Sequence, residues 1–195
     1  MKLISSNKIT DAVISLCAKA NFYLSAGVLS LLKSAYHKES NKLAKKALKQ
    51  IIDNSSIARR ESLAICQDTG LPSVFVEIGQ NVIIKGEARQ AIIRGVESGY
   101  RKFSLRNSIV KDPVLRNSPG YAPCVIHFDI VRGSSLKIIL IPKGFGCENK
   151  TRLKMFKPTA GPQEIKDFIV DTVRQAGPDA CPPYIVGVGI GGTAD

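Results

Sequence analysis

Apolar residues recur at helical spacing through the first sixty residues of the chain. Ile9, Val13 and Cys17 follow one another at intervals of four, which predicts an amphipathic helix with these side chains inward. Similar spacing predicts further helices over residues 25–37, 41–54 and 56–62. The chain is therefore expected to begin with a helical layer that covers about residues 1–63.

The pattern becomes strand-like after residue 64. Short runs of β-branched and aromatic residues predict strands at 73–78, 82–85, 125–131, 136–141 and 184–190. Turn residues separate the first pair and the second pair, as in hairpins, whereas residues 87–103 and 163–175 predict helices. The predicted fold class is α+β, with the N-terminal helical layer followed by a mostly antiparallel sheet with covering helices. Residues 1–195 are expected to form a single domain, its sheet part running from about 64 to 195.

Composition limits the class of protein. The chain has 195 residues, 44% of them hydrophobic, which suffices for one sizeable core. No apolar run approaches the length needed to cross a bilayer, and no secretory signal opens the chain, so a cytoplasmic protein with no membrane contact is expected. The net charge of +12 is scattered, without the aromatic-interleaved basic strand of a nucleic-acid-binding module. A solvated basic surface is expected instead, which would help to attract small anions such as dicarboxylates, although a lysine-rich host composition explains the charge equally well.

Five cysteines at irregular spacing fit no disulfide framework, so buried fillers, metal ligands or redox groups are expected. Cys17 lies on the apolar side of a predicted helix and reads as a core residue. Cys66 opens the segment 66–70 (CQDTG), where a glycine turn can bring its sulfur outward. Beside it, Gln67 can donate hydrogen bonds to a carboxylate and Asp68 can transfer a proton. The alternative is a buried structural cysteine followed by an ordinary Asp turn.

Two segments in the last third of the chain also carry reactive groups. Cys181 precedes two prolines, which place its sulfur on a stiff backbone, although it is equally explained as a cysteine at a strand entrance. Residues 143–150 (KGFGCENK) combine glycine backbone with Lys143, Glu148 and Asn149, and either bind an anion or form a plain surface turn. His127, on a predicted strand, reads as a sheet histidine rather than a metal ligand.

Several of these segments occur in the same order in one known family. They are 58–61 (ARRE), 65–70 (ICQDTG), 74–80 (VFVEIGQ), 142–146 (PKGFG), 148–149 (EN), 180–183 (ACPP) and 187–193 (GVGIGGT). Together they resemble the iron–sulfur hydro-lyases, and within these the α subunit of the two-subunit class I fumarate hydratases and of L(+)-tartrate dehydratase. The resemblance runs from about Ile9 to the last residue.

The resemblance implies a lyase that uses a [4Fe–4S] cluster held by three cysteines, with one iron open to the substrate. By motif match, Cys66 and Cys181 are two of the three ligands. The resemblance also implies that Gln67 and Asp68 would lie against the substrate in catalytic and binding roles, and that Lys143, Gly144 and Asn149 would help to line the pocket. In this family the remaining catalytic residues lie in a β subunit, or in a second domain when the parts are fused, so a hetero-oligomer is expected.

The implied reaction is the reversible hydration of fumarate to (S)-malate, a step of the tricarboxylic acid cycle. Dehydration of L(+)-tartrate is the alternative reaction, because both enzymes share these α-subunit segments. A non-enzymatic alternative is an inactive remnant of such an enzyme, or a structural partner that assembles without catalysing a reaction. A nucleic-acid-binding module is the third alternative and the least favoured.

Three departures from the family pattern accompany the resemblance. The family loop Asn-Thr-Gly-Asp-Asn-Thr-Pro-Ala is replaced by residues 117–124 (NSPGYAPC), and the usual serine before Glu148 is Cys147. The third cluster cysteine belongs to a later segment that this chain lacks, and Cys124 or Cys147 is the only replacement that the chain offers. The predicted strand 184–190 is apolar enough to need cover on both faces, so a C-terminally truncated subunit is expected.

Overall fold

The computed structural model describes residues 1–193; Ala194 and Asp195 lie outside the described part. The chain divides into two compact units, Met1–Pro142 and Lys143–Asp195, each of which is described by itself. Whether these residues make up one hydro-lyase domain, as the sequence suggests, stays a prediction. The helices and strands, in chain order, are β1 (Lys2–Ser5), α1 (Ser6–Phe22), α2 (Ala26–Lys38), α3 (Lys42–Glu61), β2 (Leu71–Gly79), β3 (Val82–Lys85), α4 (Ala88–Lys102), β4 (Val125–Val131), β5 (Leu136–Lys143), α5 (Phe145–Glu148), α6 (Pro162–Ala176) and the 3₁₀ helix η1 (Gly177–Ala180).

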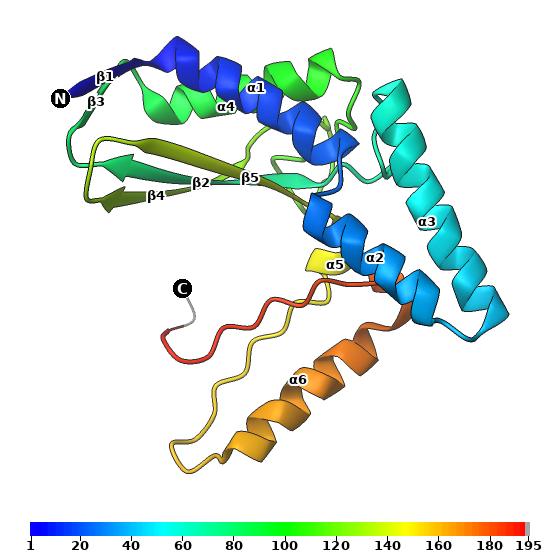
Figure 1. Ribbon diagram of the computed structural model, residues 1–195. Helices are drawn as coiled ribbons and strands as arrows, with labels where there is room; N and C mark the ends of the chain where they lie inside the picture. The colour runs from blue at the N-terminus through cyan, green and yellow to red at the C-terminus, as the bar shows by residue number, and fades with distance from the viewer. Residues whose placement is uncertain (194–195) are drawn as a thin grey trace. The chain divides into compact units, whose positions relative to one another are not determined.

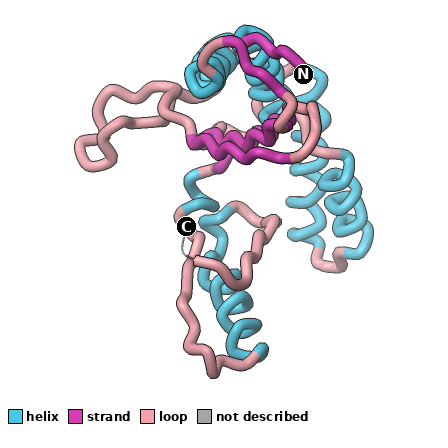
Figure 2. Tube along the Cα trace, turned by 90° about the vertical axis from the view of Figure 1, so that its left-hand side faces the viewer, coloured by secondary structure: helices cyan, strands magenta, loops and turns pink. Residues whose placement is uncertain are grey.

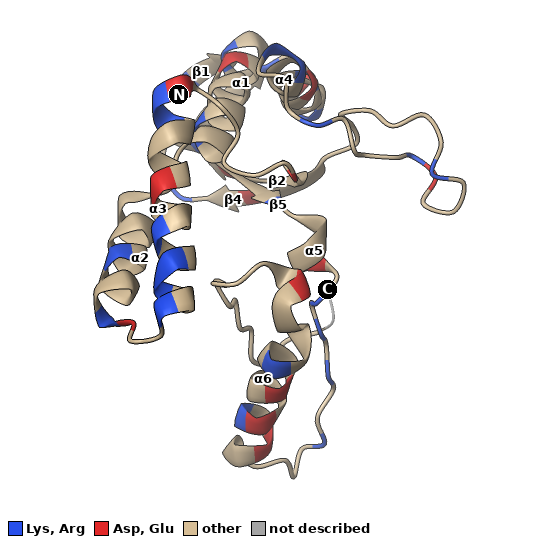
Figure 3. Ribbon diagram, turned by 90° about the vertical axis from the view of Figure 1, so that its right-hand side faces the viewer, with Lys and Arg blue, Asp and Glu red and all other residues tan. Residues whose placement is uncertain are grey.

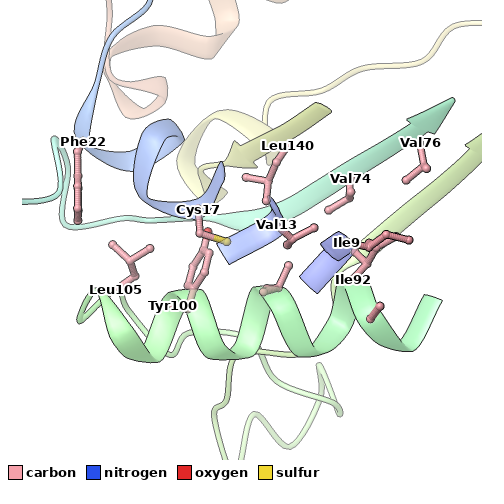
Figure 4. Packing of buried hydrophobic residues seen from close by; sticks show 12 residues of the cluster. Ile9, Val13, Cys17, Phe22, Val74, Val76, Ile92, Tyr100, Leu105 and Leu140 are labelled. Atoms are coloured by element: carbon pink, nitrogen blue, oxygen red, sulfur yellow. The ribbon is translucent and has the colours of Figure 1, made fainter. Parts of the chain in front are cut away.

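The core of the first unit lies where α1 and α4 cover one face of the sheet (Figures 1 and 4). Each helix contributes side chains at intervals of four: Ile9, Val13 and Cys17 from α1, and Ile92, Val96 and Tyr100 from α4. The two helices approach closely, because a Cβ added at Gly95 would lie 2.7 Å from the Cβ of Val13. The predicted inward face of the first helix is therefore confirmed.

The α+β class and the N-terminal helices are confirmed, but the sheet is mixed. Its strand order is β4-β2-β5, and β2 pairs with β4 in parallel, Phe75 opposite His127. The end of β2 lies beside the start of β5, since Gly79 N–H donates to Ser135 and Lys137 bridges to Glu77, so this pair runs antiparallel. The rings of Phe75 and His127 stack at 4.8 Å, as expected of a sheet histidine.

Both predicted hairpins are wrong. Strand β2 lies between β4 and β5, so these two strands do not pair with each other. Residues 79–81 do not join β2 and β3 as a hairpin either. The backbone N–H groups of Gln80 and Asn81 donate to the carbonyls of Val131 and Gly133. Strand β3 then leaves the main sheet and pairs in parallel with β1, which the sequence pattern did not predict. Residues 79–81 have the composition of a turn, but their backbone N–H groups bond to residues far away in the sequence instead of closing a hairpin.

Helices α2 and α3 pack on each other, and the two helices predicted over 41–54 and 56–62 are one continuous α3. Asn41 caps α3 by accepting from the N–H groups of Leu43 and Ala44. Lysines and arginines lie along α3, as Figure 3 shows.

One stretch of the first unit, Ser6–Lys38, is long and apolar enough to cross a membrane by length and mean hydropathy alone. The sequence reading overlooked it. This is weak support for a membrane span, because core helices and signal sequences pass the same test. In the structure this stretch divides into α1, which ends at Phe22 and buries Val13 and Cys17 in the core, and α2, whose buried residue is Leu32.

The second unit is mostly loop around α6, as Figure 2 shows. Helix α6 confirms the prediction for residues 163–175. The strand predicted over 184–190 is wrong: these residues form no strand, and Ile185 and Ile190 are 82% and 72% exposed. Residues 184–190 are apolar, as the prediction assumed, but among the described residues no neighbouring strand pairs with this segment.

Candidate functional site

The Cys66 segment is a loop that descends from the surface into the core between α3 and β2. Ser62, in the left-handed region at φ 55°, ends α3 and turns the chain. Cys66 and Gln67 are exposed, Asp68 is half-buried, and Thr69 and Gly70 are buried. The alternative of a buried structural cysteine therefore does not describe Cys66.

Two asparagines hold the outer end of this loop. The backbone N–H of Ile65 donates to the carbonyl of Asn21 at the end of α1, at 2.9 Å. The side-chain amide of Asn54 on α3 donates to the carbonyl of Ile65 at 2.8 Å. Both backbone groups of Ile65 are thus bonded, which fixes the residue next to Cys66.

The inner end is held by the core. The buried hydroxyl of Tyr100 on α4 donates to the carbonyl of Thr69 at 2.7 Å. The hydroxyl of Thr69 in turn accepts from the backbone N–H of Arg106 at 3.0 Å. Thr69 is 3% exposed, so both hydrogen bonds are shielded from water.

Within the loop, polar groups surround the sulfur. The backbone N–H of Asp68 donates to Cys66 Sγ at 3.4 Å, and the Gln67 amide oxygen lies 3.6 Å from the same sulfur. Asp68 is oriented by its own turn, because its Oδ1 accepts from Gly70 N–H at 3.0 Å. An exposed sulfur that accepts a backbone hydrogen bond is suited to be a metal ligand, since such bonds tune sulfur ligands in iron–sulfur proteins.

The other two cysteines of the first unit differ from Cys66. Burial raises the pKa of the Cys17 thiol to about 12, and burial likewise raises the pKa of the Cys124 thiol. Burial also raises the pKa of the Tyr100 hydroxyl well above its usual value. Both thiols therefore lose their protons less readily than an exposed cysteine does.

In the second unit, the 143–150 segment and Cys181 come together. The segment folds into the short helix α5, with Gly144 before its first residue and Asn149 after its last. Helix α5 packs against η1, and Cys181 follows η1 in the left-handed region at φ 57°. Lys143 bridges to Glu148 at 3.4 Å. The structure thus brings Lys143, Gly144 and Asn149 into the same small unit as Cys181, and keeps Cys66, Gln67 and Asp68 together in the first unit.

No group of three His, Cys, Asp or Glu side chains within residues 1–193 forms a metal site by itself. An open hollow of about 350 Å³ in the first unit is lined by the 118–122 part of the altered family loop, together with Arg101 and Lys111. None of the predicted site residues lines it.

Sequence reasoning missed the residues that hold the Cys66 loop. Tyr100 and Arg106 lie 31 and 37 positions from Thr69 along the chain, so no local spacing relates them. The only available signal was that a tyrosine on the inward face of a helix needs a buried acceptor for its hydroxyl.

Comparison with known proteins identifies the family of the chain. The model of the fumarate hydratase (fumerase) family matches residues 10–195. A Methanocaldococcus jannaschii protein, named as a proposed L(+)-tartrate dehydratase subunit alpha, is 41% identical over 96% of this chain and 68% of its own length. The L(+)-tartrate dehydratase subunit alpha of Escherichia coli is 28% identical over 94% of this chain and 62% of its own length.

Class I fumarate hydratases are similar over a shorter region. The aerobic enzyme of Salmonella typhimurium is 36% identical over 74% of this chain, which covers 26% of that protein. This chain therefore spans about two thirds of the tartrate dehydratase subunits and about a quarter of the class I fumarate hydratases that it matches. These relatives are hydro-lyases, which are carbon–oxygen lyases. Because the family model and the M. jannaschii relative both span nearly all of it, the chain belongs to the fumarate hydratase (fumerase) family.

Proposed function

We propose that the chain is the α-subunit part of an iron–sulfur hydro-lyase that reversibly hydrates fumarate to (S)-malate. The observation that carries this proposal is the Cys66–Asp68 loop, with exposed Cys66 and Gln67, in a chain of the fumarate hydratase family. Asn54 holds its outer end and the buried Tyr100 hydroxyl holds its inner end. Dehydration of L(+)-tartrate is the second candidate. It is favoured by the M. jannaschii relative, which is similar over almost the whole chain and is named for tartrate.

Cys66 and Cys181 would hold a [4Fe–4S] cluster as two of its three thiolate ligands. Both sulfurs belong to exposed residues on turns, which suits a soft-metal donor set, whereas Cys17 is buried. A third cysteine thiolate would complete the ligand set. When bound, the cluster would supply an open iron that polarises the substrate hydroxyl and a carboxylate.

The chain's own polar residues would bind and orient the substrate. The Gln67 amide can donate to a substrate carboxylate, and the Asp68 carboxylate can hold or deliver a proton. Asp68 suits this role because Gly70 N–H fixes one of its oxygens. In the second unit, Lys143, Asn149 and the backbone of Gly144 offer donors to an anion.

A β subunit would complete the enzyme. The relatives named as α subunits support this, since such a name implies a β-subunit partner. The assembly would be a hetero-oligomer in the cytoplasm, working on small dicarboxylates and without a nucleic-acid partner. A structural partner without chemistry is the competing proposal, and it predicts assembly without iron.

Anaerobic reconstitution of the chain with iron and sulfide, alone and with a β subunit, tests the proposal. Visible absorbance, iron content and the hydration of fumarate and dehydration of tartrate are followed together. We expect Cys66→Ser and Cys181→Ser each to lose most of the bound iron, because each removes a ligand. Cys124→Ser is the matched control and should keep it.

Equal iron content in all three variants would refute the ligand assignment. Stable binding of a β subunit with no iron under any condition would favour the structural partner instead.

A further inference from the structure

Two cysteine sulfurs of the second unit lie at the same end of η1. The Cys147 thiol donates to the carbonyl of Ala180 at 3.0 Å, and Cys181 Sγ lies 4.0 Å from the carbonyl of Asp179. These two carbonyls belong to successive residues, and both cysteines are exposed. One end of a single turn therefore carries two accessible thiols.

The contact between α5 and η1 is close because its backbone atoms approach directly. A Cβ added at Gly146 would lie 2.9 Å from the carbonyl oxygen of Asp179. An ion pair between Lys150 and Asp179, at 3.2 Å, reinforces the contact on the other side of Cys147. Cys147 is thus held against η1 by its neighbours in sequence as well as by its own hydrogen bond.

Peptide geometry limits the distance between the two cysteines. A carbonyl oxygen lies about 2.8 Å from the Cα of the next residue, so Cys147 Sγ lies within about 6 Å of the Cys181 Cα. Disulfides join residues whose Cα atoms are about 4.4–6.8 Å apart, so rotation of the two side chains together with a small shift of α5 against η1 would bring the sulfurs into bonding distance.

We propose that Cys147 and Cys181 form a thiol pair that low-molecular-weight disulfides oxidise to an intramolecular disulfide. One cysteine attacks the oxidant as its thiolate and releases one small thiol; the other cysteine then displaces the second. Two S–H bonds and the oxidant's S–S bond break, one protein S–S bond forms, and the two protons and two electrons leave on the two small thiols.

The pair has a consequence for the cluster, which rests on the proposed function. If Cys181 is a cluster ligand, the disulfide occupies its sulfur and the iron site cannot assemble until the bond is reduced. A cysteine at position 147 would then protect the iron-free subunit. The Cys147–Cys181 disulfide can be reduced again, and while it is present Cys181 cannot be oxidised irreversibly to a sulfinic or sulfonic acid.

The test treats the iron-free chain with glutathione disulfide under air, then maps peptides by mass spectrometry without reduction. We expect the peptides of Cys147 and Cys181 to be joined, with the pair lighter by two hydrogens and complete loss of alkylation at both cysteines, whereas the exposed Cys66 takes up glutathione. Cys147→Ser keeps a hydroxyl donor for the Ala180 carbonyl but should leave Cys181 as a mixed disulfide with glutathione. Cys124→Ser is the matched control and should form the same disulfide as the parent chain.

Gly146→Ala gives a second, independent variant, because its added methyl displaces α5 from η1 and should lower the yield of the disulfide. The proposal would be overturned if Cys181 of the parent chain were found as a stable glutathione adduct or joined to any other cysteine. None of these outcomes depends on bound iron or activity, so failure here is distinguishable from failure of the proposed function.

Discussion

The residue that most directly links the core to the candidate site is Tyr100. Its ring is fully buried between α1 and α4, while its hydroxyl reaches the Thr69 carbonyl at the inner end of the Cys66 loop. Packing of the first unit and the position of Asp68 therefore depend on one side chain, which is bonded to the residue that directly follows Asp68.

Replacing Tyr100 by phenylalanine should loosen the loop without opening a cavity, because only the hydroxyl is lost. The Thr69 carbonyl is left without this donor, and we expect the free energy of unfolding to fall by about 1–2 kcal/mol. Hydrogen exchange at the amides of Asp68 and Gly70 should become about five- to tenfold faster. Tyr121→Phe makes the same chemical change in a ring that contacts Tyr100, and equal exchange rates in the two variants would contradict the role of the hydroxyl.

Cys17 predicts an alkaline loss of stability. Its thiol keeps its proton in the folded chain up to a pKa of about 12, whereas in the unfolded chain it ionises near 9.0. Between these values only the unfolded state releases the proton, so the free energy of unfolding falls as pH rises, by at most about 1.4 kcal/mol per pH unit. Well below pH 9 the thiol is protonated in both states and contributes no slope.

Denaturant unfolding of the chain and of Cys17→Ala between pH 8 and 11 measures this effect. The variant starts from a lower stability because it loses packing, but its slope above pH 9 should be shallower. Parallel slopes would show that another group, such as Tyr100, controls the alkaline transition.

Among the secondary-structure elements, the crossing of α1 and α4 carries the core of the first unit. Gly95 allows it, since a methyl group there would meet both the side chain of Val13 and, at 3.0 Å, the carbonyl oxygen of Thr10. A close helix crossing of this kind leaves no room for a larger residue without backbone movement.

Gly95→Ala should therefore destabilise the chain by about 1–3 kcal/mol, seen as a lower midpoint in thermal unfolding. Gly27→Ala, in the exposed α2 helix, places its methyl in open space and should be neutral or stabilising by about 0.5–1 kcal/mol. The opposite order of the two variants would mean that α1 and α4 do not cross as the structure has them.

The elements also show which features the sequence could predict. Helices α1, α2, α4 and α6 were predictable because their apolar periodicity is local and each has an apolar face to bury. Strand pairing was not, because the residues 79–81 read as a hairpin turn while their N–H groups bond to residues more than fifty positions away. Within the site, Cys66, Gln67 and Asp68 were predictable as neighbours in the chain, but Tyr100 and the Cys147–Ala180 contact, 33 positions apart, depend on the fold.

At the scale of the whole molecule, the two units differ in how much they bury. The core cluster consists of residues from Ile9 to Leu140, whereas the buried residues of the described part of the second unit are Ala176 and Ala180. Stability should therefore be concentrated in the first unit.

Hydrogen exchange of the full chain, followed by mass spectrometry, measures this difference. Amides of α1, α4 and β2 should be protected to near the global free energy of unfolding, and amides of residues 143–193 should exchange much earlier. Addition of a β subunit should slow exchange in the second unit if it covers those residues. Uniform protection across both units in the chain alone would contradict the expectation.

The exposed apolar residues Ile185, Val186, Val188 and Ile190 have a consequence for the fate of the chain in a cell. They lie in a stretch, residues 184–190, that has no charge and no proline, and such stretches promote intermolecular strand pairing when they are uncovered. Protein quality control recognises segments of this kind. We expect the intracellular half-life of the chain to report directly on whether a partner has covered these seven residues, so an orphan subunit would be removed by proteolysis while an assembled one persists.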